Sequence, residues 1–80
     1  MNLTCDGVRL EVSIFGSGDP LLILHGFTGS AAAMEPLAER LTGHRIMPDL
    51  IGHGQSESPS SLDPYSLTNI SRQLTALLTQ

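Results

Sequence analysis

The sequence has no lysine and no tryptophan, and it has one cysteine among its 80 residues. Without lysine there is no phosphate-binding loop of the Walker type. The four arginines are scattered along the chain against eight acidic residues, which leaves a net charge of −4. Proteins recognise nucleic acid and anionic lipid through clustered basic residues, so neither is expected as a main partner. Cys5 alone forms no internal disulfide and is too little for a structural zinc site.

Long apolar runs and targeting signals are missing as well. The longest strongly apolar stretch is Leu21–Leu24, far below the roughly 18 residues of a membrane-spanning helix. The first residues contain no basic region followed by an apolar core, so we expect no signal peptide and a cytoplasmic protein. His25, His44 and His53 do not show metal-ligand spacing. We therefore expect neither membrane insertion nor a metal site.

The first third of the chain predicts a β-hairpin followed by a buried strand. Apolar and polar residues alternate from 8 to 14, the period of a strand with one buried face. Asp6-Gly7 precedes this run and suits a type I′ turn, so residues 3–15 form the expected hairpin. Leu21–Leu24 then suits a strand that is buried on both faces, as in a parallel sheet.

A helix and a further strand are expected next. The helix starts near Ala32 or Ala33, and Gly43 is placed as the residue after its end. Its apolar stripe consists of Met34, Leu37, Ala38 and Leu41. Residues 45–48 predict a short strand, so strand, helix and strand form a right-handed parallel crossover.

The last third predicts a long loop and a final helix. Residues 49–66 show no periodicity, and loops of this length are usually functional or disordered. An apolar stripe follows, with Ser66 as the N-cap of the helix. The stripe consists of Leu67, Ile70, Leu74, Leu77 and Leu78.

The first candidate site is the segment HGFTGS, residues 25–30, directly after the buried strand. Open α/β sheets place ligands at this end of a parallel strand. Gly26 and Gly29 allow backbone N–H groups to approach an anionic or polarised oxygen closely. The alternative is a strand-to-helix turn in which the glycines serve geometry alone.

A second segment, GHGQSE at residues 52–57, fails two tests. It is no dinucleotide-binding fingerprint, because Glu57 occupies the third glycine position. It is no nucleophile elbow around Ser56, because Ser58 replaces the second glycine and no buried strand precedes it. Asp49 ends a strand and is expected to bind the backbone of the turn that follows, with a charged role in a site as the alternative.

Taken together, residues 20–30 (PLLILHGFTGS) and 49–56 (DLIGHGQS) resemble two signature loops of the α/β-hydrolase superfamily. The resemblance implies that the backbone N–H of Phe27 forms one half of an oxyanion hole, while Gly26 and His25 set the loop geometry. It implies an α/β fold with an incomplete sheet: residues 1–80 are expected to be the N-terminal fragment of a single α/β-hydrolase domain.

The catalytic serine, acid and histidine would follow this fragment in the chain. The 80-residue chain alone is therefore expected to be inactive and poorly folded. Like its superfamily, the parent enzyme is expected to act on a small-molecule substrate and to need no metal or organic cofactor. The oligomeric state stays open.

Within the superfamily, these loops and the following Pro-Tyr-Ser-Leu (residues 64–67) resemble most closely the synthases of menaquinone biosynthesis. Those lyases eliminate pyruvate to form 2-succinyl-6-hydroxy-2,4-cyclohexadiene-1-carboxylate. The resemblance implies a Ser-Asp-His lyase as the parent enzyme. A carboxylic-ester hydrolase, a carbon–carbon bond hydrolase and a non-catalytic relative are the alternatives within the superfamily. A standalone binding module fits the open half-sheet poorly.

Overall fold

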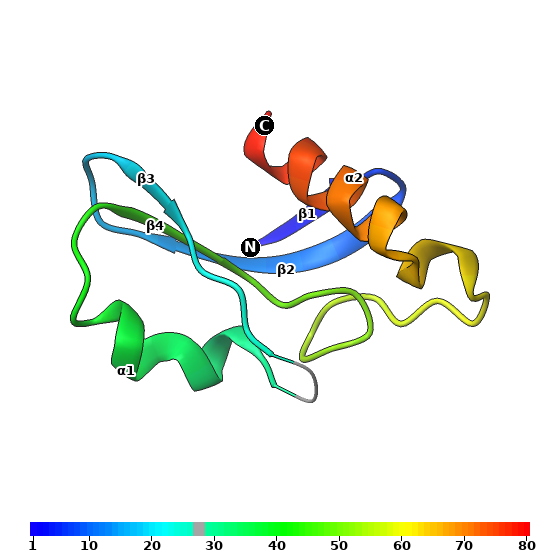
Figure 1. Cartoon of the computed structure of the whole chain (residues 1–80), viewed down its shortest axis with the longest axis horizontal. Helices are drawn as coiled ribbons and strands as arrows, with labels where there is room; N and C mark the ends of the chain where they lie inside the picture. The colour runs from blue at the N-terminus through cyan, green and yellow to red at the C-terminus, as the bar shows by residue number, and fades with distance from the viewer. Residues whose placement is uncertain (27–28) are drawn as a thin grey trace.

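The computed structural model describes residues 1–26 and 29–80. These residues form a four-stranded mixed sheet in the order β1-β2-β4-β3, with helical segments on both of its faces (Figure 1). The strands are β1 (Asn2–Cys5), β2 (Val8–Phe15), β3 (Pro20–Leu22) and β4 (His44–Pro48). The helical segments are η1 (Ala31–Met34), α1 (Glu35–Ala38), η2 (Asp63–Tyr65) and α2 (Leu67–Leu78).

The predicted hairpin and the predicted parallel pair are both confirmed. β1 and β2 are antiparallel, and Cys5 lies opposite Val8 beside the turn. Asp6 and Gly7 have φ angles of 51° and 80°, as the type I′ turn requires. β2 also pairs antiparallel with β4, and β4 pairs parallel with β3. The helical segments η1 and α1 connect the two parallel strands.

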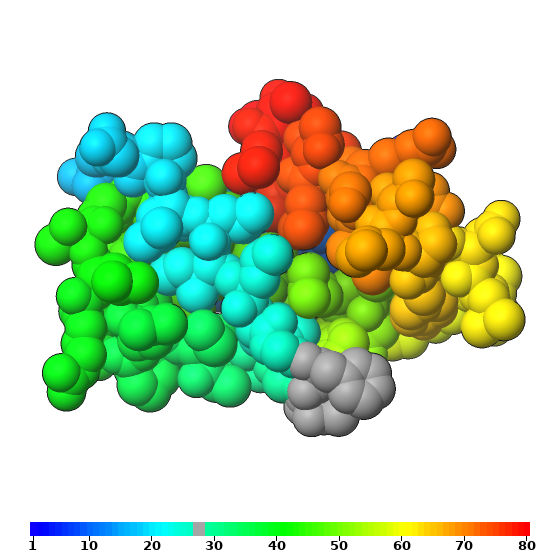
Figure 2. All heavy atoms as spheres, in the orientation of Figure 1, coloured from blue at the N-terminus to red at the C-terminus, as the bar shows by residue number. Residues whose placement is uncertain are grey.

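The strand expected at Leu21–Leu24 is shorter and less buried than predicted. β3 ends at Leu22, although the Ile23 N–H still donates to the Ile46 carbonyl at 2.9 Å. Leu24 is 41% exposed. The reason is that β3 pairs with β4 along one edge only, so it is the last strand of the described sheet and lies at the surface in Figure 2.

The helix expected from Ala32 is also shorter. A 3₁₀ turn, η1, leads into the single α-helical turn of α1, and Pro36 lies near the start of that turn, where a missing N–H is tolerated. Gly43 was predicted to follow the helix end directly, and it does not. The Arg45 guanidinium instead donates to the carbonyl of Ala38, the last residue of α1, at 2.9 Å and to that of Leu41, which lies beyond α1, at 2.8 Å.

The last helix, α2, is confirmed with its N-cap. The Ser66 side chain accepts a hydrogen bond from the Asn69 N–H at 3.1 Å. Its buried face differs from the predicted stripe, because Leu67 is 82% exposed. Gln73 is buried instead, and its amide donates to the Pro64 carbonyl at 2.8 Å. This bond ties α2 to η2 at its entrance.

Two apolar clusters lie on opposite faces of the sheet. One joins β1 and β2 to α2 and includes Leu10 and Leu77, while the other joins β4 to η1 and α1 and includes Met47 and Ala38. Ile46 packs against the first cluster and its neighbour Met47 belongs to the second, as expected when side chains alternate across a strand. Because β3 and β4 are parallel, the segments that follow them leave the sheet at the same end.

No helix in residues 1–26 and 29–80 has the length and apolar character needed to cross a membrane.

Candidate functional site

The two signature segments lie side by side. β3 and β4 are parallel, so the chain leaves both strands at the same end of the sheet. The Leu50 N–H, two residues past β4, donates a hydrogen bond of 2.9 Å to Nε2 of His25. Phe27, the predicted oxyanion donor, lies outside the described residues together with Thr28. The structure therefore defines the frame on either side of these two positions.

His25 makes its hydrogen bonds on the N-terminal side of the segment 26–30. The side chain is buried, and its Nδ1 lies 2.8 Å from the Gly26 carbonyl oxygen. The Gly29 N–H donates to the same oxygen at 3.0 Å. His25 and Gly26, both predicted to set the loop geometry, thus share one hydrogen-bond network with Leu50.

Asp49 binds the chain on the C-terminal side of the segment 26–30. Its Oδ1 accepts the Ala31 N–H at 2.7 Å, at the start of η1. Its Oδ2 accepts the Gln55 N–H at 3.0 Å, which is the expected bond to the following turn. The bond to Ala31 was not predicted. Residues 49 and 50 therefore hold both ends of the segment 26–30.

Two glycines of the second segment are explained by close approach. Gly54 has a φ of 51°, and a Cβ atom there would lie 2.3–2.7 Å from the carboxylate atoms of Asp49. Gly52 has a φ of 76°, and a Cβ there would lie 2.8 Å from the Tyr65 ring. Any larger residue at 54 displaces the carboxylate that holds Ala31.

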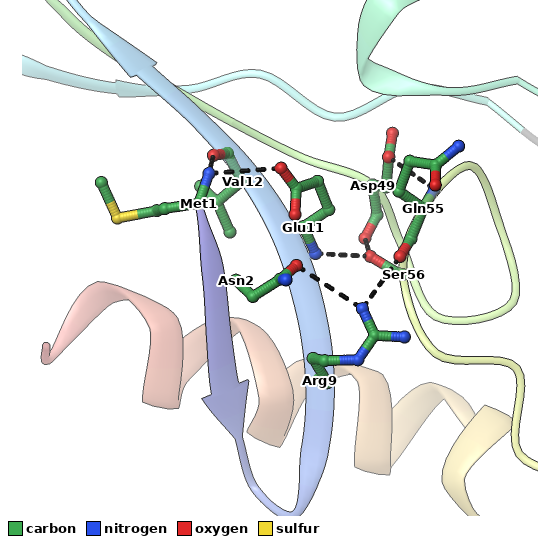
Figure 3. Close-up of polar contacts among 8 residues, drawn as sticks. All are labelled: Met1, Asn2, Arg9, Glu11, Val12, Asp49, Gln55 and Ser56. Carbon is green, nitrogen blue, oxygen red and sulfur yellow. Dashed lines mark hydrogen bonds and ion pairs between the residues drawn. The ribbon is translucent and has the colours of Figure 1, made fainter.

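Ser56 has a structural role. Together with Asp49 and Leu50 it forms the set of hydrogen bonds, here called the brace, that links the two signature segments to each other and to β2. It is buried, accepts the Glu11 N–H at 2.9 Å and donates to the Asp49 carbonyl (Figure 3). The Asp49 N–H in turn donates to the Glu11 carbonyl at 2.8 Å. The hydroxyl thus links the second segment to β2, which agrees with its rejection as a nucleophile.

A cavity of about 330 Å³ lies beside Gly26. It is lined by Gly26, Leu50, Ile51, His53, Tyr65 and Ile70. The His53 ring also packs against His25, with ring centroids 4.9 Å apart. His44, the third histidine, is on β4 and does not join them. Across the described part of the chain, no three His, Cys, Asp or Glu side chains gather as metal ligands.

Comparison with known proteins agrees with this frame. The profile of the alpha/beta hydrolase fold family matches residues 19–80. Lipase 1 of Psychrobacter immobilis is 46% identical over 48 residues, which cover 59% of this chain and 15% of the lipase. A Bacillus subtilis (strain 168) protein provisionally named 2-succinyl-6-hydroxy-2,4-cyclohexadiene-1-carboxylate synthase is 38% identical over 72 residues, or 85% of this chain and 26% of that protein.

The crystal structure of epoxide hydrolase VrEH1 from Vigna radiata superposes on 99% of this chain and 27% of its own, with a TM-score of 0.87 and 26% identity. The chain spans 15% of the lipase and 26% of the Bacillus protein.

Proposed function

This chain belongs to the α/β-hydrolase fold family, and from that premise we propose that residues 1–80 form the N-terminal segment of a single catalytic α/β-hydrolase domain. In this proposal the segment supplies the oxyanion-hole loop, with the backbone N–H of Phe27 as one donor. His25 and Gly26 shape the loop. The nucleophile, acid and base belong to other parts of the domain.

One observation carries the proposal: Asp49 and Leu50 hold the segment 26–30 at both of its ends. An oxyanion hole lowers the activation barrier only when its donors are fixed before the reaction starts. A turn that served geometry alone would not need a buried carboxylate at one end and a buried imidazole at the other.

Two substitutions in the complete protein test the donor. Phe27→Pro removes the N–H, and we expect kcat to fall by roughly 10²–10³. Phe27→Ala keeps the N–H, so its kcat falls only modestly. Both variants are compared at matched melting temperatures, because proline can also distort the loop. A folded Phe27→Pro variant as active as Phe27→Ala would refute the oxyanion role.

For the reaction we propose a Ser-Asp-His lyase that eliminates pyruvate in menaquinone biosynthesis. The proposal is supported by 38% identity to the Bacillus protein over 85% of this chain. In such a reaction the triad abstracts a proton, and the hole stabilises the negative oxygen that develops. We include in this proposal a small-molecule substrate, no metal or organic cofactor, and a cytoplasmic location.

Ester hydrolysis is the second candidate, supported by 46% identity to Lipase 1 over 48 residues. Pyruvate release from the pyruvate-bearing precursor and hydrolysis of p-nitrophenyl esters are assayed on the same preparation. A kcat/KM far higher for the precursor supports the lyase, and the reverse supports an esterase. Absence of both activities, with no elbow serine in the complete protein, would indicate a non-catalytic relative.

A further inference from the structure

The cavity beside Gly26 lies between the second signature segment and the start of α2. Residues 50, 51 and 53 line one side of it, and Tyr65 of η2 and Ile70 of α2 line the other. The chain leaves β3 and β4 at this end of the sheet, where open α/β sheets place ligands. Its volume of about 330 Å³ is at the lower end of the roughly 300–1,000 Å³ of small-molecule sites. The cavity therefore has room for one group of a ligand.

The walls of the cavity are apolar and belong to the core of the molecule. Ile51 is only 2% exposed and is a member of the apolar cluster that joins β1 and β2 to α2. Tyr65 and Ile70 are half-buried and pack against the same cluster. The shape of the cavity is therefore fixed by packed side chains.

The polar atoms around the cavity are already engaged. The Tyr65 hydroxyl donates to the Pro59 carbonyl at 2.7 Å, and Nδ1 of His53 lies 2.9 Å from the Ile51 carbonyl oxygen. Among the lining residues that the structure describes there is no Asp, Glu, Lys or Arg. A charged group that entered would lose its hydration without gaining a partner of opposite charge. An uncharged apolar group is stabilised there, because its surface is removed from water.

We propose that this cavity binds an uncharged alkyl or aryl group of the substrate, and that Ile70 limits the size of that group. The proposal rests on the proposed function, which places the reaction at this end of the sheet. Hydrogen bonds hold His53 and Tyr65, and Ile51 is part of the core. Ile70 is held only by packing, so its side chain can change in size without breaking any of these bonds.

Primary alcohols from 1-butanol to 1-octanol test the cavity independently of turnover. They are titrated into the complete protein, with carbon-13 NMR of the isoleucine methyl groups as the readout. We expect the Ile51 and Ile70 methyl signals to shift together, and the affinity to rise roughly threefold to fourfold per methylene until the cavity is full. Adipate also has six carbons but is charged at both ends, so it should bind at least tenfold more weakly than 1-hexanol. Unshifted Ile51 and Ile70 signals, or equal binding of adipate and 1-hexanol, would overturn the proposal.

Substitutions on α2 test the size limit. Ile70→Phe fills the cavity and should weaken 1-hexanol binding at least tenfold. Leu74→Phe is the matched control, because Leu74 is also half-buried and packs against the same cluster but does not line the cavity. Ile70→Ala enlarges the cavity and should move the best alcohol to a longer chain, whereas Leu74→Ala should not. If variants at the two positions behave alike, the role of Ile70 is wrong.

Inhibition kinetics test whether the bound group is part of the substrate. In whichever of the two proposed assays gives turnover, 1-hexanol should raise KM and leave kcat unchanged. Alcohol binding without such inhibition would show that the substrate does not use the cavity, and the proposed function would still stand. If Phe27→Pro instead keeps full activity, the oxyanion role fails, while the alcohol titrations still decide the cavity. Absence of turnover in both assays would remove the substrate role, whatever the alcohols do.

Discussion

Replacing Gly54 by alanine tests the brace between the two signature segments. The alanine Cβ would lie 2.3–2.7 Å from three carboxylate atoms of Asp49, so the carboxylate has to move. That movement breaks or stretches its bonds to the N–H groups of Ala31 and Gln55, now 2.7 and 3.0 Å long. The φ of 51° adds the strain of a left-handed conformation.

The magnitude follows from these two contributions. A residue with a Cβ in the left-handed region costs roughly 1–2 kcal/mol. Loss of a hydrogen bond to a charged acceptor costs roughly 1.5–3 kcal/mol. If one of the two bonds is lost, Gly54→Ala lowers the free energy of unfolding by about 2.5–5 kcal/mol. Gly7→Ala is the matched control, because Gly7 also has a positive φ of 80° but nothing lies within 4 Å of the added Cβ.

Equilibrium urea unfolding of the complete protein measures both variants, each made with and without Asp49→Ala. Removing the carboxylate should reduce the cost of Gly54→Ala to that of Gly7→Ala, which stays near 1–2 kcal/mol. The reasoning is refuted if Gly54→Ala costs no more than Gly7→Ala. It is equally refuted if the cost of Gly54→Ala is unchanged when Asp49 is alanine.

Three further predictions concern the rest of the chain. Residues 1–80 alone should be inactive, associate with rising concentration in sedimentation and lack slowly exchanging amides, because the outer edge of β3 pairs with no other strand among the described residues; a monomer with a cooperative melt would contradict this. Ser66→Ala should cost the complete protein about 1 kcal/mol in urea unfolding by removing the N-cap bond to Asn69, whereas Ser60→Ala, in the exposed loop, should cost little. Burial raises the pKa of the Cys5 thiol, against a smaller opposing effect of its bond to Gln80. The stabilisation from the protonated thiol is therefore complete below the pKa of the thiol in the unfolded state. It is lost as pH rises through the pKa of the thiol in the folded state. Cys5→Ala should therefore reduce the fall of Tm at alkaline pH.

Local signals predicted the hairpin and the parallel unit. Asp6-Gly7 is a turn pair whose conformation depends on its own backbone, and the alternation of β2 follows from one buried face. The N-cap at Ser66 is local in the same sense, because its bond to Asn69 spans three residues.

The errors arose where distant residues decide the outcome. Periodicity extended the helix through Leu41, but the Asp49 carboxylate binds the N–H at its start and the Arg45 guanidinium binds the Leu41 carbonyl beyond its short α turn. The burial of Gln73 depends on the Pro64 carbonyl, nine residues earlier in the chain. Pattern reasoning on hydrophobicity has no means of assigning a glutamine to a buried face.

The candidate site was likewise predicted where the signal is local and missed where it depends on distant residues. Both signature segments and His25 were found from the sequence, because glycine and histidine directly after an apolar strand form a recognisable pattern. The link between them was not found, since the bond from Ala31 to Asp49 spans 18 residues and depends on strand pairing. The nearest available signal was Asp49 itself, a carboxylate at a strand end with more acceptor capacity than one turn requires.

The two signature segments are best understood as one device. In the proposed oxyanion hole, a glycine-rich loop would gain close approach to an oxygen at the cost of stiffness, so the stiffness would have to come from outside the loop. The Asp49 carboxylate, the Leu50 N–H and the Ser56 hydroxyl provide it through hydrogen bonds to η1, His25 and β2. Gly54 is glycine because the carboxylate occupies the space that its side chain would need. The spacing of the second segment therefore follows from holding the first, and a substitution in either should alter the hydrogen bonds at Ala31 and His25.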